Sequence, residues 1–186
     1  MAIDDLIQDA QRRMDKSVEA AQAEFATLRT GRASPALLDR VQIDYYGQKT
    51  PLKQLATINV PEPRMLTVQP FDPSSLKTIE KAIQESDLGL TPSNDGKTIR
   101  LPIPQLTEER RKDMAKIARS LAEEGRVAVR NVRRDAMHHL KEKVDKGEVG
   151  ADEERQAEQR VQKATDEHVK TIDELLKHKE AEIMEV

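Results

Sequence analysis

The sequence predicts an α+β protein in which a long three-helix bundle carries a small inserted domain. Near both ends of the chain, apolar residues recur every three or four positions over many turns, which is the period of an amphipathic helix. All nine prolines, by contrast, lie between Pro35 and Pro104, among short β-branched runs separated by turn residues. Three such helices cannot bury their narrow apolar stripes alone, so a bundle is the expected arrangement.

The first helix is expected from about Ile3 to Arg29, because no proline or glycine interrupts its apolar period. At 1.5 Å per residue it is about 40 Å long. The composition then changes abruptly at Thr30 and Gly31. The positions expected to face the bundle core are Ile3, Ile7, Ala10, Met14, Val18, Ala21, Phe25 and Leu28.

The small α+β domain is expected over residues 31–104, inserted between the two parts of the bundle, residues 1–30 and 105–186. One helix fits inside it, beginning after Pro73 and ending near Ser86. Turn residues bound each of the short runs that should form strands. These runs are residues 41–46, 57–60, 65–68 and 98–101.

The second and third helices follow the last prolines. Thr107 is the expected N-cap of the second, which ends near Gly147, and the third begins near Asp152. Gly125 lies within the second helix and should cost about 1 kcal/mol relative to alanine. The expected inward positions are Met114, Ile117, Leu121, Ala128, Val132, Ala136 and Leu140 on the second helix, and Ala157, Val161, Ala164, Ile172, Leu175 and Ile183 on the third.

The composition excludes several classes of protein. There is no cysteine, so disulfides, thiol catalysis and zinc sites with cysteine ligands are absent. No apolar run approaches the roughly 20 residues of a membrane span. The acidic, amphipathic start resembles neither a signal nor a transit peptide, which favours a cytoplasmic protein. Neither a phosphate-binding loop nor a nucleophile motif is visible, so we expect no enzyme activity, cofactor or metal.

The second helix carries a basic ridge. Residues 108–150 hold twelve basic and nine acidic side chains, although the whole chain has a net charge of -3. At about 100° per residue, five of the basic residues fall within a sector of roughly 60°, opposite the apolar positions expected to face inward. They are Lys112, Arg119, Arg126, Arg130 and Arg133. A phosphate backbone explains such a ridge well, with a solvated helix face as the alternative.

The few aromatic residues limit what kind of nucleic acid this ridge could bind. Single-strand platforms stack bases on aromatic rings, so structured RNA or duplex backbone fits better. Tyr45 and Tyr46 are interpreted as a strand end entering a turn at Gly47, with contact to a partner as the alternative. Adjacent His138 and His139 would point about 100° apart on a helix and so could not hold one metal ion.

Five motifs resemble those of the ribosome recycling factor family. They are residues 28–35 (LRTGRASP), 45–47 (YYG), 86–90 (SDLGL), 106–111 (LTEERR) and 126–135 (RVAVRNVRRD). They occur in the order and spacing of that family, and the resemblance covers essentially the whole chain. It implies an L-shaped molecule in which a two-stranded hinge joins the bundle to a β/α/β domain. Members of the family act with elongation factor G and GTP to split post-termination ribosomes into subunits.

The resemblance also implies roles for particular residues. Arginines typical of the family fall on Arg32, Arg111, Arg130 and Arg133 and would contact large-subunit ribosomal RNA. Arg111 lies off the ridge by angle, so it either faces RNA or pairs with Glu108. The complete expected ribosome-binding set is Arg32, Arg111, Arg119, Arg126, Arg130 and Arg133, and the expected hinge consists of Thr30, Gly31, Pro102 and Pro104.

The expected partners are therefore the ribosome, through its large subunit, and elongation factor G, with the free protein a monomer. A helical co-chaperone or adaptor is the competing interpretation, since composition and helix length fit it almost as well. A hydrolase that used the scattered carboxylates would need a concave site, which three thin helices do not obviously supply.

Overall fold

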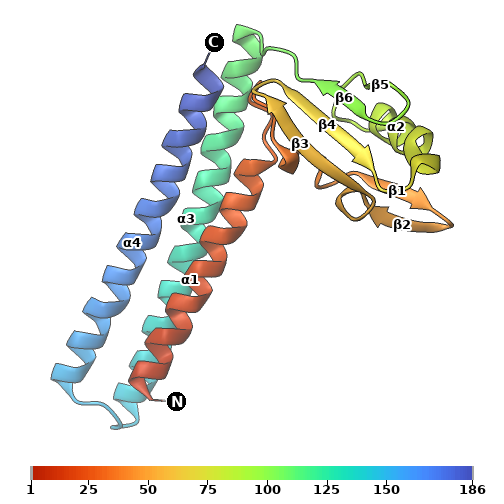
Figure 1. Ribbon diagram of the computed structural model, residues 1–186. Helices are drawn as coiled ribbons and strands as arrows, with labels where there is room; N and C mark the ends of the chain where they lie inside the picture. Colours follow the sequence, from red (N-terminus) through yellow and green to blue (C-terminus); the bar gives the residue numbers. More distant parts are fainter. Residues whose placement is uncertain (1, 186) are drawn as a thin grey trace. The chain divides into compact units, whose positions relative to one another are not determined.

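The computed structural model describes residues 2–185 and divides them into two compact units (Figure 1). One unit consists of residues 2–25 and 115–181, and the other of residues 26–114 and 182–185. The division falls inside three helices, so that Ala26, residues 108–114 and residues 182–184 belong to the unit that contains the sheets.

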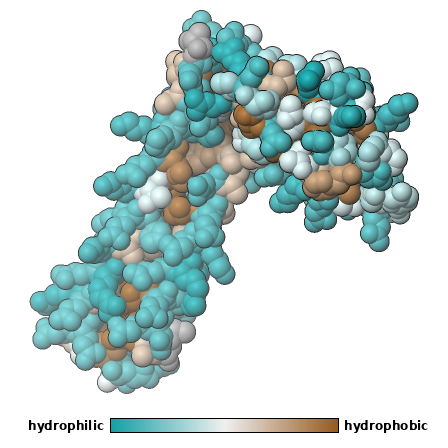
Figure 2. Space-filling model, in the orientation of Figure 1, coloured by the Kyte–Doolittle hydropathy of each residue, from teal (hydrophilic) through white to brown (hydrophobic). Residues whose placement is uncertain are grey.

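The helical unit is built from α1 (Ile3–Ala26), α3 (Glu108–Asp145) and α4 (Ala151–Met184), which lie side by side in Figure 1. All three expected helices are confirmed. Apolar side chains fill the space between them, including Ile7, Met14 and Ile172, which are almost completely buried. Figure 2 shows hydrophilic residues over most of the visible surface of these helices, with smaller patches of hydrophobic residues among them.

Polar contacts link each pair of helices in this unit. A guanidinium nitrogen of Arg13 on α1 lies 2.8 Å from a carboxylate oxygen of Asp135 on α3. This hydrogen bond is the main reason that the pKa of the Asp135 carboxyl is lowered. The Nε2 atom of His168 on α4 lies 2.6 Å from Asp15 Oδ1 on α1. These contacts lie outside the apolar core and complement it.

The buried stripe of α3 differs in phase from the expected one. Ile117 was expected to face inward but is 41% exposed, and Leu121 and Ala128 are only partly buried. The residues that actually fill the core between Met114 and Val132 are Ala118, Ala122 and Val129, each one position further along, together with Gly125. The small residues Ala118, Ala122 and Gly125 allow the helix axes to approach closely, which explains why Ala118 and Ala122 face inward in place of Ile117 and Leu121.

Gly125 packs tightly against both neighbouring helices. A Cβ atom placed on it would lie 3.1 Å from Cδ1 of Ile172 on α4 and 3.2 Å from Cβ of Ala21 on α1. Both distances are shorter than ordinary carbon–carbon contacts. The glycine therefore lets three helices meet at one level, and packing offsets its low helix propensity.

The second unit contains a hairpin, a four-stranded sheet and one α-helix. Strands β1 (Gln42–Tyr45) and β2 (Gln48–Pro51) form the hairpin. The sheet has the order β3-β4-β6-β5 with antiparallel neighbours, from β3 (Ala56–Glu62), β4 (Met65–Pro70), β5 (Ser93–Asn94) and β6 (Ile99–Pro102). Helix α2 (Leu76–Glu85) packs on it through the buried side chains of Ile79 and Ile83.

Two strands were not expected. In β2 the sequence Gln48-Lys49-Thr50-Pro51 has no apolar alternation, so its pairing depends on the turn before it. Tyr46 and Gly47 there have φ angles of 50° and 82°, the left-handed pair that a tight hairpin requires. The interpretation of Tyr45-Tyr46-Gly47 as a strand end entering a turn is thereby confirmed. Strand β5 has only two residues, too few for a sequence pattern.

The N-terminus of α3 is capped as expected, because Thr107 Oγ1 accepts a hydrogen bond of 3.1 Å from the main-chain nitrogen of Arg110. We expect Thr107→Ala to lower the free energy of unfolding by about 1 kcal/mol, since that nitrogen loses its acceptor. Urea denaturation followed by circular dichroism would measure the change. Thr107→Ser, which keeps the hydroxyl, should restore most of the loss, and equal losses in the two variants would contradict the capping role.

Candidate nucleic-acid interface

The basic residues of α3 flank its buried stripe. We expected them opposite the core, but the shift in phase places them about a quarter turn from it, on the side of α3 that meets α4. Arg119 Nε lies 3.6 Å from Glu180 Oε1, and Arg133 donates to Gln162 Oε1 over 3.4 Å, both acceptors being on α4. The expectation that the ridge lies opposite the buried stripe is therefore wrong.

Arg119, Arg126, Arg130 and Arg133 form the basic flank of α3. Their side chains differ in solvent exposure and in how closely they are paired with carboxylates. The side chains of Arg119 and Arg130 are 64% and 46% exposed, and each has one ion pair longer than 3.5 Å. Arg126 is only 20% exposed and lies 2.7 Å from Asp173 and 2.8 Å from Glu123. The hydrogen bond from Arg126 to Asp173 is the main cause that raises the pKa of its guanidinium. Arg126 therefore mainly stabilises the bundle.

We expect Arg126→Ala to destabilise the helical unit by about 1–2 kcal/mol, because it leaves Asp173 without its charged partner. Its effect on binding to RNA should be smaller than that of Arg130→Ala, since two carboxylates already occupy its guanidinium. Urea unfolding and an RNA-binding titration on the same two variants test both statements. A variant that folds like the parent but binds RNA less well than Arg130→Ala would reverse the assignment.

A second group of arginines lies in the other unit, around a cavity of about 460 Å³. Arg32 comes from the segment after α1, and Arg111 from the first turn of α3. Of the two alternatives for Arg111, pairing with Glu108 is not observed, because Lys112 lies 3.6 Å from that carboxylate. Within residues 2–185, the buried Nε atom of Arg111 finds no hydrogen-bond acceptor.

The cavity also contains residues that sequence reasoning missed. Arg64 lies in the turn between β3 and β4, and Gln105 precedes α3. Glu182 and Glu185 come from the last turn of α4 and the residue beyond it. None of these has a periodic or motif signal, so only the fold brings them together.

The residues expected to form a hinge all lie in the unit with the sheets. Thr30 is buried, and its hydroxyl donates to Glu182 over 3.3 Å. Gly31 has a φ of 82°, a left-handed conformation that favours glycine. Pro102 ends β6 opposite Met65, so it is part of the sheet, and Pro104 follows two residues later. The assignment of these four residues to a hinge remains a prediction.

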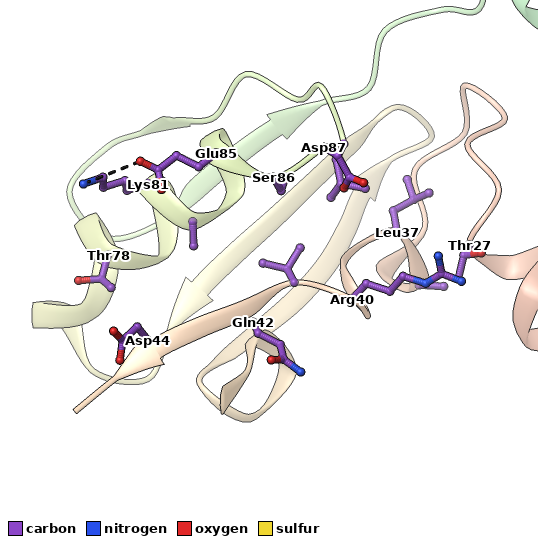
Figure 3. Close-up of a pocket in the computed structure, with 14 residues that line it drawn as sticks. Thr27, Leu37, Arg40, Gln42, Asp44, Thr78, Lys81, Glu85, Ser86 and Asp87 are labelled. Atoms are coloured by element: carbon purple, nitrogen blue, oxygen red, sulfur yellow. Dashed lines mark ion pairs between the residues drawn. The ribbon is translucent and has the colours of Figure 1, made fainter. Parts of the chain in front are cut away.

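A larger cavity of the sheet-containing unit, about 730 Å³, lies elsewhere, between α2, β1 and residues 36–41 (Figure 3). Its charged side chains have both signs, and Lys81 lies 3.8 Å from Glu85 along α2. It includes none of the expected site residues. Among residues 2–185, no cluster of histidine and carboxylate side chains could hold a metal ion, and no helix is long and apolar enough to cross a membrane.

Comparison with known proteins identifies the family to which these features belong. The family model described as ribosome recycling factor matches residues 21–184. The chain is 58% identical over 180 residues to the ribosome-recycling factor of Rubrobacter xylanophilus, covering 97% of each chain. It is 56% identical over 182 residues to that of Halalkalibacterium halodurans, covering 98% of each.

Two solved structures resemble the chain throughout. A solution structure of a ribosome recycling factor has a TM-score of 0.78 and 42% identity, covering 100% of this chain and 99% of the other. A structure of the T. thermophilus factor with E. coli elongation factor G on the E. coli post-termination complex has a TM-score of 0.72 and 48% identity, with 100% of both chains covered. By sequence and by fold, the chain belongs to the ribosome recycling factor family.

Proposed function

We propose that this protein, together with elongation factor G and GTP, splits post-termination ribosomes into subunits and so frees them for new initiation. The observation that carries the proposal is the match to ribosome recycling factors along nearly the whole chain. The structural relative on the post-termination complex, where elongation factor G is also bound, supports both partners. The site of action would be the cytoplasm, where ribosomes and elongation factor G work together.

Binding to large-subunit ribosomal RNA is assigned to two groups of arginines. The first is the basic flank of α3. There Arg119 and Arg130 are exposed and Arg133 is partly exposed, whereas Arg126 mainly stabilises the bundle. The second consists of Arg32 and Arg111 at the cavity of the other unit. Guanidinium groups suit this task because their planar fork can bind a phosphate through two parallel hydrogen bonds.

The bundle and the inserted domain would have different mechanical roles. The bundle, residues 1–30 and 105–186, anchors on RNA, while residues 31–104 move about a hinge at Thr30, Gly31, Pro102 and Pro104. Helix α3 has 38 residues, which makes it about 57 Å long and stiff enough to transmit force between distant contacts. Hydrolysis of GTP by elongation factor G supplies the energy, so this chain needs no catalytic group of its own.

Light scattering with purified post-termination ribosomes tests the proposed function. We expect subunits to separate only when this protein, elongation factor G and GTP are all present. Leaving out any one of them should leave the scattering unchanged. No separation with all three present would contradict the proposal and bring the adaptor interpretation forward.

The dependence of ribosome binding on salt tests the electrostatic anchor. Five phosphate contacts predict that the logarithm of the association constant falls with the logarithm of salt concentration at a slope of about -4. Co-sedimentation with large subunits over a series of potassium chloride concentrations measures this slope. A slope near zero would exclude the arginines as the anchor, even if splitting were observed.

A further inference from the structure

The cavity around Arg32 and Arg111 holds equal numbers of opposite charges. Its volume is about 460 Å³, and its polar lining includes Gln105 beside the charged groups. The cationic side chains come from the segment after α1, the β3–β4 turn and the start of α3, whereas two of the three carboxylates come from the end of α4. The charged side chains are those of Arg32, Arg64, Arg111, Glu62, Glu182 and Glu185.

Arg32 is only weakly paired with the carboxylates of this cavity, whereas Arg64 donates to the side-chain oxygen of Gln105 over 2.8 Å. The Arg32–Glu185 ion pair is 3.4 Å long, and the two side chains are 55% and 57% exposed. Charge-assisted hydrogen bonds are normally about 2.7–2.9 Å long, and exposed pairs of this kind contribute little. Arg111 has a buried Nε–H group with no acceptor among the described residues. Of these arginines, Arg32 is therefore the one that an incoming anion can engage most readily.

The main-chain segments that carry Arg32 and Arg64 have shorter hydrogen bonds than the segment that carries Glu185. Ala33 donates from its main-chain nitrogen to Pro63 O over 2.7 Å, and Ile103 donates to Arg64 O over 2.8 Å. These bonds fix the segments that carry Arg32 and Arg64 against each other. Glu185 lies beyond the last residue of α4, and its main-chain nitrogen donates to Glu182 O over 3.3 Å. The cationic part is thus preorganised, and the carboxylate is the easier part to displace.

We propose that this cavity is a phosphate-binding pocket in which the Glu185 carboxylate occupies the place that an RNA phosphate takes on binding. The proposal rests on the proposed function for the identity of the ligand as RNA. A phosphodiester can offer several acceptors to the arginines that line the cavity, whereas within residues 2–185 the Glu185 carboxylate pairs with Arg32. Arg64 and Gln105 are additional contacts beyond the expected set.

The carboxylate makes the pocket selective. An isolated anion must displace Glu185 without other contacts to compensate, so it binds weakly. A folded RNA engages the basic flank of α3 at the same time, and those contacts help to displace the carboxylate. Glu185 therefore lowers binding to small anions more than binding to ribosomal RNA.

The first test uses inorganic phosphate and does not depend on ribosomes. Glu185→Gln removes the competing charge, and Glu174→Gln removes the same charge from an exposed position on α4 as a control. We expect phosphate titrations, followed by the NMR signals of the Arg32 and Arg111 Nε–H groups, to show about fivefold tighter binding to Glu185→Gln than to wild type. Equal binding by the two variants would overturn the proposal.

The second test uses large ribosomal subunits. We expect Glu185→Gln to bind them more tightly than wild type, because binding no longer has to break the Arg32–Glu185 ion pair. Adding Arg32→Ala should abolish this gain, and a gain that persists would contradict the pocket. If wild type itself fails to bind subunits while phosphate shifts the arginine signals, the proposed function fails and the phosphate pocket stands.

Discussion

Replacing Arg130 and Arg133 together by alanine is expected to weaken binding to large ribosomal subunits about a hundredfold. Each guanidinium that pairs with a phosphate contributes about 1.5 kcal/mol, and two such losses give about two factors of ten. Within residues 2–185, Arg130 has one ion pair, a long one to Glu123 over 3.7 Å, so it is readily available to a ligand. Subunit splitting should fall with binding at limiting protein concentration, as light scattering would record.

The matched control removes two positive charges from the acidic third helix. Lys163 and Lys170 are exposed on α4, and Lys163→Ala with Lys170→Ala gives the same change in net charge. We expect this control to bind within about threefold of wild type, since only long-range attraction is lost. Because Arg133 also donates to Gln162, urea unfolding must show that both double variants are folded. Equal losses of binding in the two would move the anchor away from α3.

Gly125→Val should be the most destabilising single change in the helical unit, lowering the free energy of unfolding by about 2–3 kcal/mol. Overpacking a tightly packed core commonly costs this much. A Cβ there would lie 3.2 Å from the Cβ of Ala21, which is fixed to the main chain of α1, so the helices themselves must separate. Cδ1 of Ile172, 3.1 Å from the added Cβ, is at the end of a flexible side chain and can move aside more easily.

Ser120→Val is the control for Gly125→Val, because Ser120 is exposed on the same helix. It introduces the same β-branched side chain without a neighbour to displace, so its effect should stay below about 0.5 kcal/mol. Urea unfolding of both variants, followed by circular dichroism, gives the comparison. If both variants lost the same stability, close packing at Gly125 would not explain the result.

The sequence was sufficient to predict the elements, but not the side that one helix buries. The apolar period identified all three long helices and most strands, because that period follows directly from helix and strand geometry. On α3, however, Ile117 and Ala118 compete for the core. Hydrophobicity favours the larger residue, whereas close packing against Ala21 and Ile172 at Gly125 favours the smaller ones. How closely two helices pack cannot be predicted from a single sequence.

The candidate site was predictable in part for the same reason. The cluster of basic residues on one side of α3 followed from their spacing, but its direction depended on the phase of the buried stripe. Arg32 and Arg111 were singled out only by resemblance to a family. Nothing local in the sequence indicates that they share a cavity, or that Arg64 and Glu185 join them there. Such clusters depend on contacts between distant segments.

The place of the insertion in the chain has a consequence for how the bundle folds. Helices α3 and α4 are joined by residues 146–150 alone, so their contacts close a short loop and can form early. Helix α1 is separated from them by the whole sheet-containing segment, and the Ala21–Gly125 contact must close that long loop. We therefore expect a helical hairpin of α3 and α4 to precede docking of α1. Substitutions at Ala21 would then change mainly the rate of unfolding, and those between α3 and α4 the rate of folding.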